Sequence, residues 1–307
     1  MKITALLLFF CFSFTAFAAG PSAVKIKPAP QPGFCIFGAQ SGKPFGTVAA
    51  FKSVIWKSDV VYAGGDAGLL TVQEARLEAL KAMREARGSK IAVGFEAFDM
   101  NLQPALDDFT AGKISEEDLL QKAARQKGSA VDPAVYKPVL NFIARNKLRA
   151  LALNVPKEII SKIEREGPAS LNDEDKKLVP SPLKISKHKK YLEFLKTSFG
   201  GGVPVPAEAP AWDNYLASVS AWNEAAGTRI ADFINSNPGW SLLIMAGNNR
   251  LAYNAALPAS VKSRTIKLRQ ASFYAEDGTK CPAALPKERK DLANYIWYTS
   301  STTITTK

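Results

Sequence analysis

Polar residues that could take part in catalysis or ligand binding follow four short apolar runs of this sequence. Glu96 and Asp99 come directly after the run from Ile91 to Phe95. A carboxylate that enters a partly buried cleft has a raised pKa unless it is paired, so Glu96 could be a general base, a metal ligand, an anchor for a backbone amide or a structural carboxylate. The other three runs end in Gly64-Gly65-Asp66-Ala67, Asn154-Val155-Pro156 and Gly247-Asn248-Asn249-Arg250.

Several familiar site types do not match the residues present. The glycines at 64, 65 and 68 lack the G-x-G-x-x-G spacing of a dinucleotide site. The stretch 38–44 is one residue short of a P-loop and has proline where the magnesium-binding hydroxyl belongs. His188 is the single histidine of the chain, which argues against zinc held by paired histidines and against a Ser-His-Asp triad.

The elements that must position these residues alternate between strand and helix patterns. Four apolar runs predict strands at 60–63, 91–95, 150–153 and 241–246. Helical periodicity between them predicts, among others, a helix from Thr71 to Arg87 with Thr71 and Glu74 as a capping box, and a long helix over 212–234. This alternation indicates an α/β fold: a mostly parallel sheet flanked by helices, with a helical insertion and a linker at 200–210. The carboxyl ends of parallel strands share one edge, so we expect one cleft there.

The two ends of the chain carry different signals. A short apolar stretch followed by Ala16-Phe17-Ala18 predicts a cleaved signal peptide over 1–18 and therefore an exported protein, periplasmic or secreted, with membrane association left open. Cleavage leaves Cys35 and Cys281, which we expect to pair because exported proteins form disulfides; two unrelated buried thiols are the alternative. We expect an irregular lead at 19–50, one domain over 51–270 and a tail at 271–307 that packs on it.

Positive charge is in excess, with a formal net charge of +12. Export makes nucleic acid a poor partner, whereas anionic lipid or a small anionic ligand stays open. The densest basic run, Lys184 to Lys196, has apolar residues near helical spacing, so its lysines and His188 are interpreted as the solvated face of a helix.

Several segments in order resemble the ChaN-like haem-binding uptake family, whose superfamily includes Tiki-type proteases and erythromycin-esterase-like hydrolases. The resemblance covers about residues 59–261 and includes IAVGFEAFDMNLQPALDDF, YKPVLNFIARNKLRALALNVP, SAWNEAAGTRIADFI and LLIMAGNNRLAYNAALPASV. Motif by motif it implies ligand-binding candidates at Glu96, Gln103, Tyr136, Asn154, Trp222, Glu224, Asn248, Arg250 and Tyr253. Asp99, from the same strand end as Glu96, is a further candidate.

This sequence also departs from the family's motifs. A Gly-Glu-x-His motif is replaced by residues 64–67, and a Gly-Asn-Gly-His motif by residues 247–250, so both histidines are lost. Asn223 stands where the family has aspartate. The resemblance implies haem as ligand, with Tyr136 or Tyr253 as tyrosines that could hold iron and Arg250 as a partner for a propionate.

We therefore expect an exported haem- or iron-related binding protein rather than an enzyme, with a homodimer possible. Two alternatives stay open: a metal-dependent hydrolase that uses Glu96, and a non-catalytic scaffold that binds an acidic partner.

Overall fold

The computed structural model describes residues 35–45, 47–125, 133–199, 211–277 and 281–299. The predicted signal peptide at 1–18, the predicted linker at 200–210 and the last residues, 300–307, lie outside this part of the chain. Among the described residues, no helix has the length and apolar character needed to cross a bilayer.

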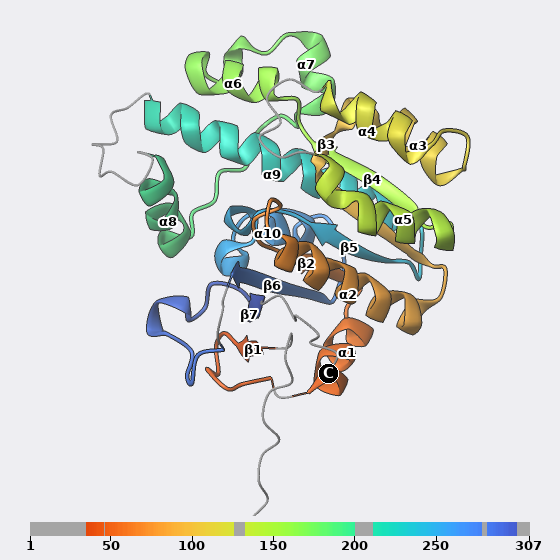
Figure 1. The fold of residues 1–307 in the computed structure, drawn as a ribbon. Coiled ribbons are helices and arrows are strands. Elements are labelled where there is room, and N and C mark those ends of the chain that lie inside the picture. Colours follow the sequence, from red (N-terminus) through yellow and green to blue (C-terminus); the bar gives the residue numbers. More distant parts are fainter. Residues whose placement is uncertain (1–34, 46, 126–132, 200–210, 278–280, 300–307) are drawn as a thin grey trace, which may run out of the picture.

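A mixed sheet forms the centre of the molecule (Figure 1). In the described residues it has seven strands in the order β1-β7-β6-β2-β5-β3-β4, and every neighbouring pair is parallel except β1 with β7. The mostly parallel α/β architecture predicted from the sequence is confirmed. The strands are β1 (Cys35–Gly38), β2 (Val60–Ala63), β3 (Ile91–Asp99), β4 (Arg149–Asn154), β5 (Ser241–Met245), β6 (Gln270–Asp277) and β7 (Tyr295–Thr299).

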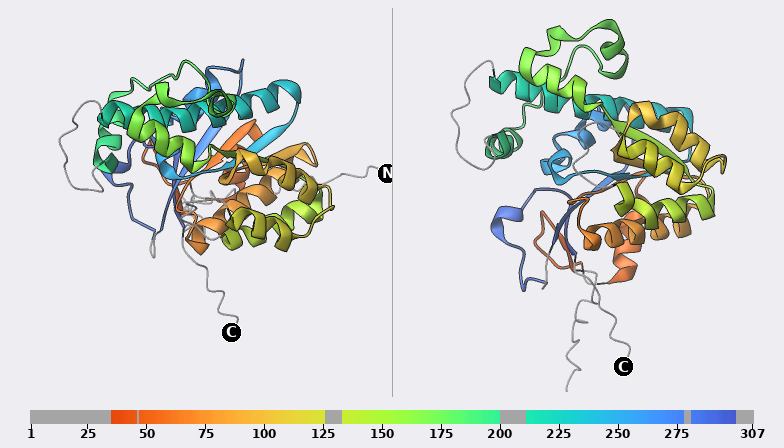
Figure 2. Two further views of the ribbon diagram at one scale, coloured as in Figure 1. Left: turned by 90° about the horizontal axis from the view of Figure 1, so that it is seen from above. Right: turned by 45° about the horizontal axis from the view of Figure 1, so that its top comes forward.

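Helices cover both faces of this sheet (Figures 1 and 2). They are α1 (Val48–Lys57), α2 (Leu70–Arg87), α3 (Gln103–Thr110), α4 (Glu116–Ala124), α5 (Lys137–Asn146), α6 (Lys157–Glu166), α7 (Asp173–Leu178), α8 (Lys189–Phe199), α9 (Ala211–Ser236) and α10 (Leu257–Lys262). Helices α1 to α5 share one apolar core with one face of the strands, and α9 and α10 share another with the opposite face.

Alternating side chains explain how one short strand contributes to two cores. Val61 packs among the residues of α1 to α5, whereas Val60 and Tyr62 pack against α9 and α10. Successive side chains of a strand point to opposite faces, so a strand covered on both sides is apolar throughout. All four residues of β2 are buried accordingly. Helices α6 and α7 lie outside α9 and pack on it through a third core.

The two ends of the described chain differ most from the prediction. Strand β1 lies inside the lead predicted as irregular, and α1 crosses the expected domain boundary at residue 51. Strand β6 crosses the boundary at 270, and with β7 it is part of the central sheet rather than a tail beside it. Cys35 and Cys281 are joined by a disulfide with a Cα–Cα distance of 5.5 Å, which ties β1 to the segment after β6.

Three local predictions were wrong in detail. Thr71 was predicted to cap helix α2, but the helix begins one residue earlier, at Leu70, and has no side-chain cap. Thr71 lies within the helix, and its Oγ1 accepts a hydrogen bond from Thr299 instead. Strand β3 runs on to Asp99 rather than ending at Phe95. Helix α8 begins at Lys189, so His188 and the residues before it precede the helix.

Candidate functional site

Glu96 lies near the carboxyl end of β3 and is engaged through both of its oxygens. Its Oε1 accepts a hydrogen bond from Nε of Arg250 at 2.5 Å, in an ion pair. Its Oε2 accepts the backbone N–H of Gly247 at 2.5 Å. A carboxylate held by two donors is an anchor for the loop after β5, which is one of the roles that the sequence allows.

Arg250 is the centre of this strand-end cluster, and only 3% of the residue is exposed. Besides the Glu96 pair, its Nη2 donates to Oδ1 of Asn154 at 3.3 Å. The guanidinium also lies over the Trp222 ring, 4.8 Å from the ring centroid, where the π-electron face attracts a cation. One side chain thus links β3, β4 and α9, and it lies away from solvent.

Asp99 and Asn154 complete the cluster at the ends of β3 and β4. The Asn154 Nδ2 donates to Oδ1 of Asp99 at 2.8 Å. Burial raises the pKa of the Asp99 carboxyl, and the hydrogen bond from Asn154 opposes part of that rise. The structure therefore brings together five of the residues selected from the sequence: Glu96, Asp99, Asn154, Trp222 and Arg250.

The glycine turn after β2 packs against a buried arginine. Arg76 of α2 is 1% exposed and donates to the carbonyl oxygens of Ala63 at 3.3 Å, Gly65 at 3.1 Å and Ala246 at 2.9 Å. Burial lowers the pKa of this guanidinium, because the charged form is poorly solvated there. The turn is glycine for steric reasons, since a Cβ on Gly64 would lie 2.4 Å from Oδ1 of Asn248.

Sequence reasoning missed Arg76, although a signal was present. Val72, Ala79, Leu80 and Met83 are buried along α2, and Arg76 falls on the same stripe. An arginine on the apolar face of a helix must find acceptors inside the protein, and here these are carbonyls at the ends of β2 and β5.

Three predicted site residues have positions that suit a structural role instead. Gln103 caps an edge of β4 by donating to the carbonyl of Ala150 at 3.0 Å and accepting the N–H of Ala152 at 2.8 Å. Asn248 forms two hydrogen bonds with the backbone of Ala275 in β6. Tyr136 is described below.

Tyr136 is a core residue, 2% exposed. Its ring packs edge-to-face on Phe95 with centroids 5.6 Å apart. Burial raises the pKa of its hydroxyl, although the nearby charge of Arg76 opposes this. A buried phenol within an aromatic core offers no approach for a large planar ligand.

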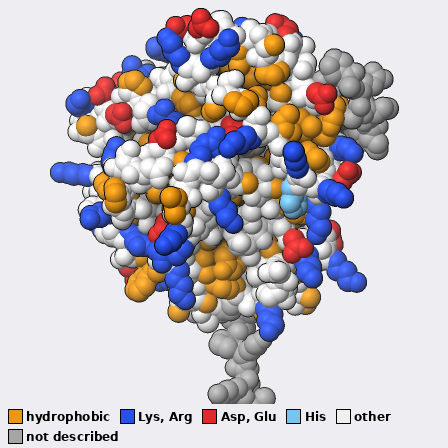
Figure 3. Space-filling model, turned by 180° about the vertical axis from the view of Figure 1, so that it is seen from behind, with side chains coloured by type: hydrophobic (Ala, Val, Ile, Leu, Met, Phe, Trp, Pro, Cys, Tyr) orange, Lys and Arg blue, Asp and Glu red, His pale blue; other side chains and the backbone are white. Residues whose placement is uncertain are grey.

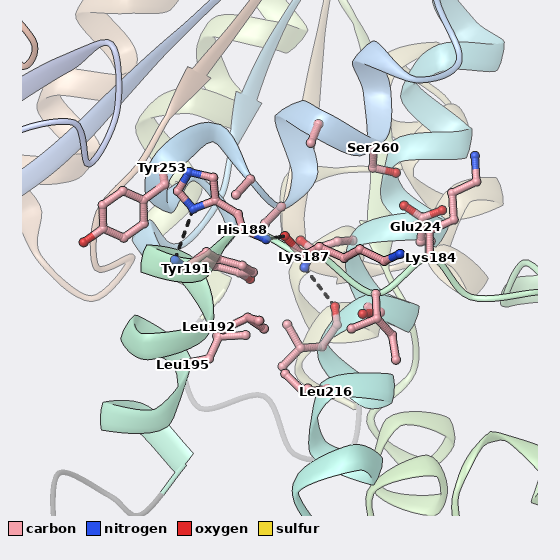
Figure 4. Close-up of a pocket in the computed structure, with 18 of the residues that line it drawn as sticks. Lys184, Lys187, His188, Tyr191, Leu192, Leu195, Leu216, Glu224, Tyr253 and Ser260 are labelled. Carbon is pink, nitrogen blue, oxygen red and sulfur yellow. Dashed lines mark hydrogen bonds between the residues drawn. The ribbon is translucent and has the colours of Figure 1, made fainter.

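A cavity lies elsewhere, beside α8. A cavity of about 540 Å³ lies between the segment 184–188, α8, α9, the turn at 253–256 and α10 (Figure 4). Its apolar wall consists of Leu192, Leu195, Leu216, Val219 and Ala256. Pockets that hold drug-sized ligands occupy about 300–1,000 Å³ and have mostly apolar walls with few polar groups.

Two candidates from the sequence line this cavity. Glu224 is buried and forms an ion pair with Arg264 at 2.6 Å, so its charge is compensated. Tyr253 has a left-handed backbone with φ of 58°, held by its N–H bond to the Leu292 carbonyl at 2.6 Å. In Figure 4 the ring of Tyr253 lies beside the cavity, while its hydroxyl points away from the other labelled side chains.

His188 also lines the cavity, as the residue that precedes α8. Its Nδ1 accepts the backbone N–H of Tyr191 at 3.2 Å, which satisfies a free donor at the start of the helix. Its ring stacks on Tyr253 with centroids 5.5 Å apart. His188 is exposed, in agreement with the sequence prediction, but the prediction did not place it beside a cavity.

One family model matches more than half of the chain, and one solved structure shares its fold. The family model described as "Haem-binding uptake, Tiki superfamily, ChaN" matches residues 53–261. The solved structure of cofacial haem binding to ChaN of Campylobacter jejuni is 13% identical, covers 87% of this chain and 96% of its own, and superposes with a TM-score of 0.63.

Two further similarities are weaker. A mutant of the erythromycin esterase EreC, in its open conformation, is 10% identical with a TM-score of 0.44, over 78% of this chain and 76% of its own. Protein RETICULATA-RELATED 5, chloroplastic, from Arabidopsis thaliana is 20% identical over 85% of this chain, which spans 37% of that longer protein's length.

Proposed function

Because this chain belongs to the ChaN family of haem-binding uptake proteins, within the Tiki superfamily, we propose that it is an exported protein that binds haem as cargo in the cavity beside α8. The observation that carries this proposal is the cavity itself, about 540 Å³ with an apolar wall and basic residues at its edge. By contrast, Tyr136 is only 2% exposed, and Arg250 at the centre of the strand-end cluster is only 3% exposed.

The residues around the cavity suit the parts of a haem. Its apolar wall would contact the macrocycle, and Lys184 and Lys187 would pair with the propionates. Haem iron is held in proteins by histidine or tyrosine, among other ligands. His188 is the exposed candidate at this cavity. Tyr253 also lines the cavity, but its hydroxyl points away from the other labelled side chains (Figure 4). Tyr191 is 2% exposed, and burial raises the pKa of its hydroxyl.

The strand-end cluster does not favour the alternative of a hydrolase that uses Glu96. Both Glu96 oxygens already accept hydrogen bonds, from Arg250 and from Gly247. Within the described residues there is also no group of three or more His, Cys, Asp or Glu side chains arranged to hold a metal. We propose that the residues at the strand ends stabilise the fold, and that no catalytic site remains where the family has its two histidine motifs.

Export is part of this proposal. The signal peptide predicted over 1–18 would direct the chain to the periplasm or outside the cell, and the disulfide between Cys35 and Cys281 suits an oxidising compartment. A homodimer, in which two cavities could face each other, remains a prediction that light scattering of the haem-loaded protein would test.

Haem titration of the mature protein, followed by the Soret band, tests the proposal. We expect saturable binding, a changed Soret band in His188→Ala, and weaker binding in Lys184→Gln/Lys187→Gln. Tyr136→Phe is the matched control, because a core tyrosine should not alter the spectrum. Absence of saturable binding by the wild type, or a spectrum changed only by Tyr136→Phe, would refute the assignment of haem to this cavity.

A further inference from the structure

Residues 184–190, which we name the basic rim, lie at the edge of the cavity and carry four lysines in seven residues. Lys184, Lys187, Lys189 and Lys190 are all exposed. Ile185 lies among them, and 44% of this residue is exposed. The basic rim thus combines positive charge with an exposed aliphatic side chain.

The positive charge of the basic rim is largely uncompensated. Lys190 forms an ion pair with Asp291 at 3.2 Å, with both side chains well exposed. No ion pair joins Lys184, Lys187 or Lys189 to an acid in the part of the chain that the structure describes. In the protein without haem, three charges are therefore available to a partner.

The basic rim has a defined conformation near its helix. The backbone N–H of His188 is 3.4 Å from the Ser186 hydroxyl, and the His188 carbonyl accepts the N–H of Leu192 at 3.0 Å. The His188 ring stacks on Tyr253, which holds the imidazole against the rest of the protein. Figure 3 shows basic side chains gathered around the single histidine, on one face of the molecule.

We propose that the basic rim docks on a bilayer surface that contains anionic phospholipids. Lysines near such a surface are attracted to its negative potential, and an exposed aliphatic side chain can enter the headgroup layer. Ile185 distinguishes this partner from a soluble polyanion, which would gain nothing from an aliphatic side chain. Docking in this way would place the cavity opening beside the lipid, where amphiphilic ligands partition.

Vesicle co-sedimentation of the mature protein without haem tests the docking separately from haem binding. We expect binding to vesicles of phosphatidylcholine mixed with phosphatidylglycerol, little binding to phosphatidylcholine alone, and loss of binding at high salt. Lys184→Gln/Lys187→Gln should weaken partitioning about 25-fold, since each lysine near an anionic surface contributes about a factor of five. Ile185→Ser should weaken it at unchanged charge.

The matched control is Lys57→Gln/Lys122→Gln, which removes the same charge from α1 and α4 on the other side of the sheet. It should bind vesicles as the wild type does, apart from a small effect of net charge. The docking proposal is wrong if the control loses as much binding as the rim variant, or if Ile185→Ser has no effect. Retention on heparin without any vesicle binding would assign the rim to a soluble polyanion and would equally overturn the proposal.

Discussion

Replacing Arg250 by methionine tests whether the strand-end cluster stabilises the fold. The substitution keeps an unbranched apolar stem and removes the guanidinium that contacts Glu96, Asn154 and Trp222. Breaking a buried ion pair by removing one partner costs about 3–5 kcal/mol. The Glu96 side chain is 26% exposed and keeps its bond from Gly247, so the lower end, about 3 kcal/mol, applies here.

Urea unfolding, followed by circular dichroism, measures this loss. With an unfolding entropy of about 2.1 cal/mol/K per residue, a destabilisation of about 3 kcal/mol corresponds to a fall in Tm of about 5 °C for a chain of 307 residues. The double-mutant cycle with Glu96→Gln should give a coupling energy above about 1 kcal/mol, because the two side chains share an interaction. Arg269→Met is the matched control. In the wild type Arg269 forms an ion pair with Asp59 at 2.7 Å, but this arginine is largely exposed, so its replacement should lower the free energy of unfolding only a little.

The reasoning is refuted if Arg250→Met unfolds within about 0.5 kcal/mol of the wild type, the range usual for surface substitutions. Additive effects of the Glu96 and Arg250 substitutions would refute it as well, since they would show that the contact carries no shared energy. Either result would mean that water solvates Glu96 and Arg250 well enough to replace the ion pair between them.

Two further outcomes follow from the disulfide and from Asp99. Cys35→Ser/Cys281→Ser should lower the Tm, because the bridge spans 246 residues and the chain-entropy estimate for such a loop is about 5 kcal/mol as an upper value; an unchanged Tm would show that sheet pairing alone fixes β1. Asp99→Asn should gain stability relative to the wild type as pH rises above about 4. Burial raises the pKa of Asp99 in the folded state, so its ionisation disfavours folding above its unfolded pKa; a difference between the two proteins that stays constant from pH 4 to 7 would contradict this.

The sequence predicts the inner sheet well because its strands are buried on both faces. Val60 to Ala63 and Ser241 to Met245 are continuous apolar runs flanked by helical periodicity, which is the pattern of parallel strands under helices. Strand β6 was not predicted because its residues are not a continuous apolar run. Ala271, Phe273 and Ala275 alternate with Ser272 and Tyr274, although Ser272 is also buried in the sheet.

The site is only partly predictable for a different reason. Motif positions bring Glu96, Asn154 and Arg250 together because they lie near or just after the carboxyl ends of strands that meet at one edge of the sheet. The cavity, by contrast, depends on how α8 lies against α9 and α10, and no spacing in the sequence encodes that packing. The sequence therefore predicts a surface position for His188, and it gives no sign that this residue borders a cavity.

The order of the sheet also has a consequence for biosynthesis. β1, at the start of the described chain, has β7 as its strand neighbour, and β7 lies at the end of the described chain. While the chain emerges from the ribosome, β1 lacks its neighbour until β7 has been made, and the exposed strand must wait unpaired. The segment from α1 to α10 already contains both helical layers and the strands between them, and can pack first. A nascent chain stopped before Tyr295 would thus retain its inner core but leave its amino-terminal strand open to pairing with other chains.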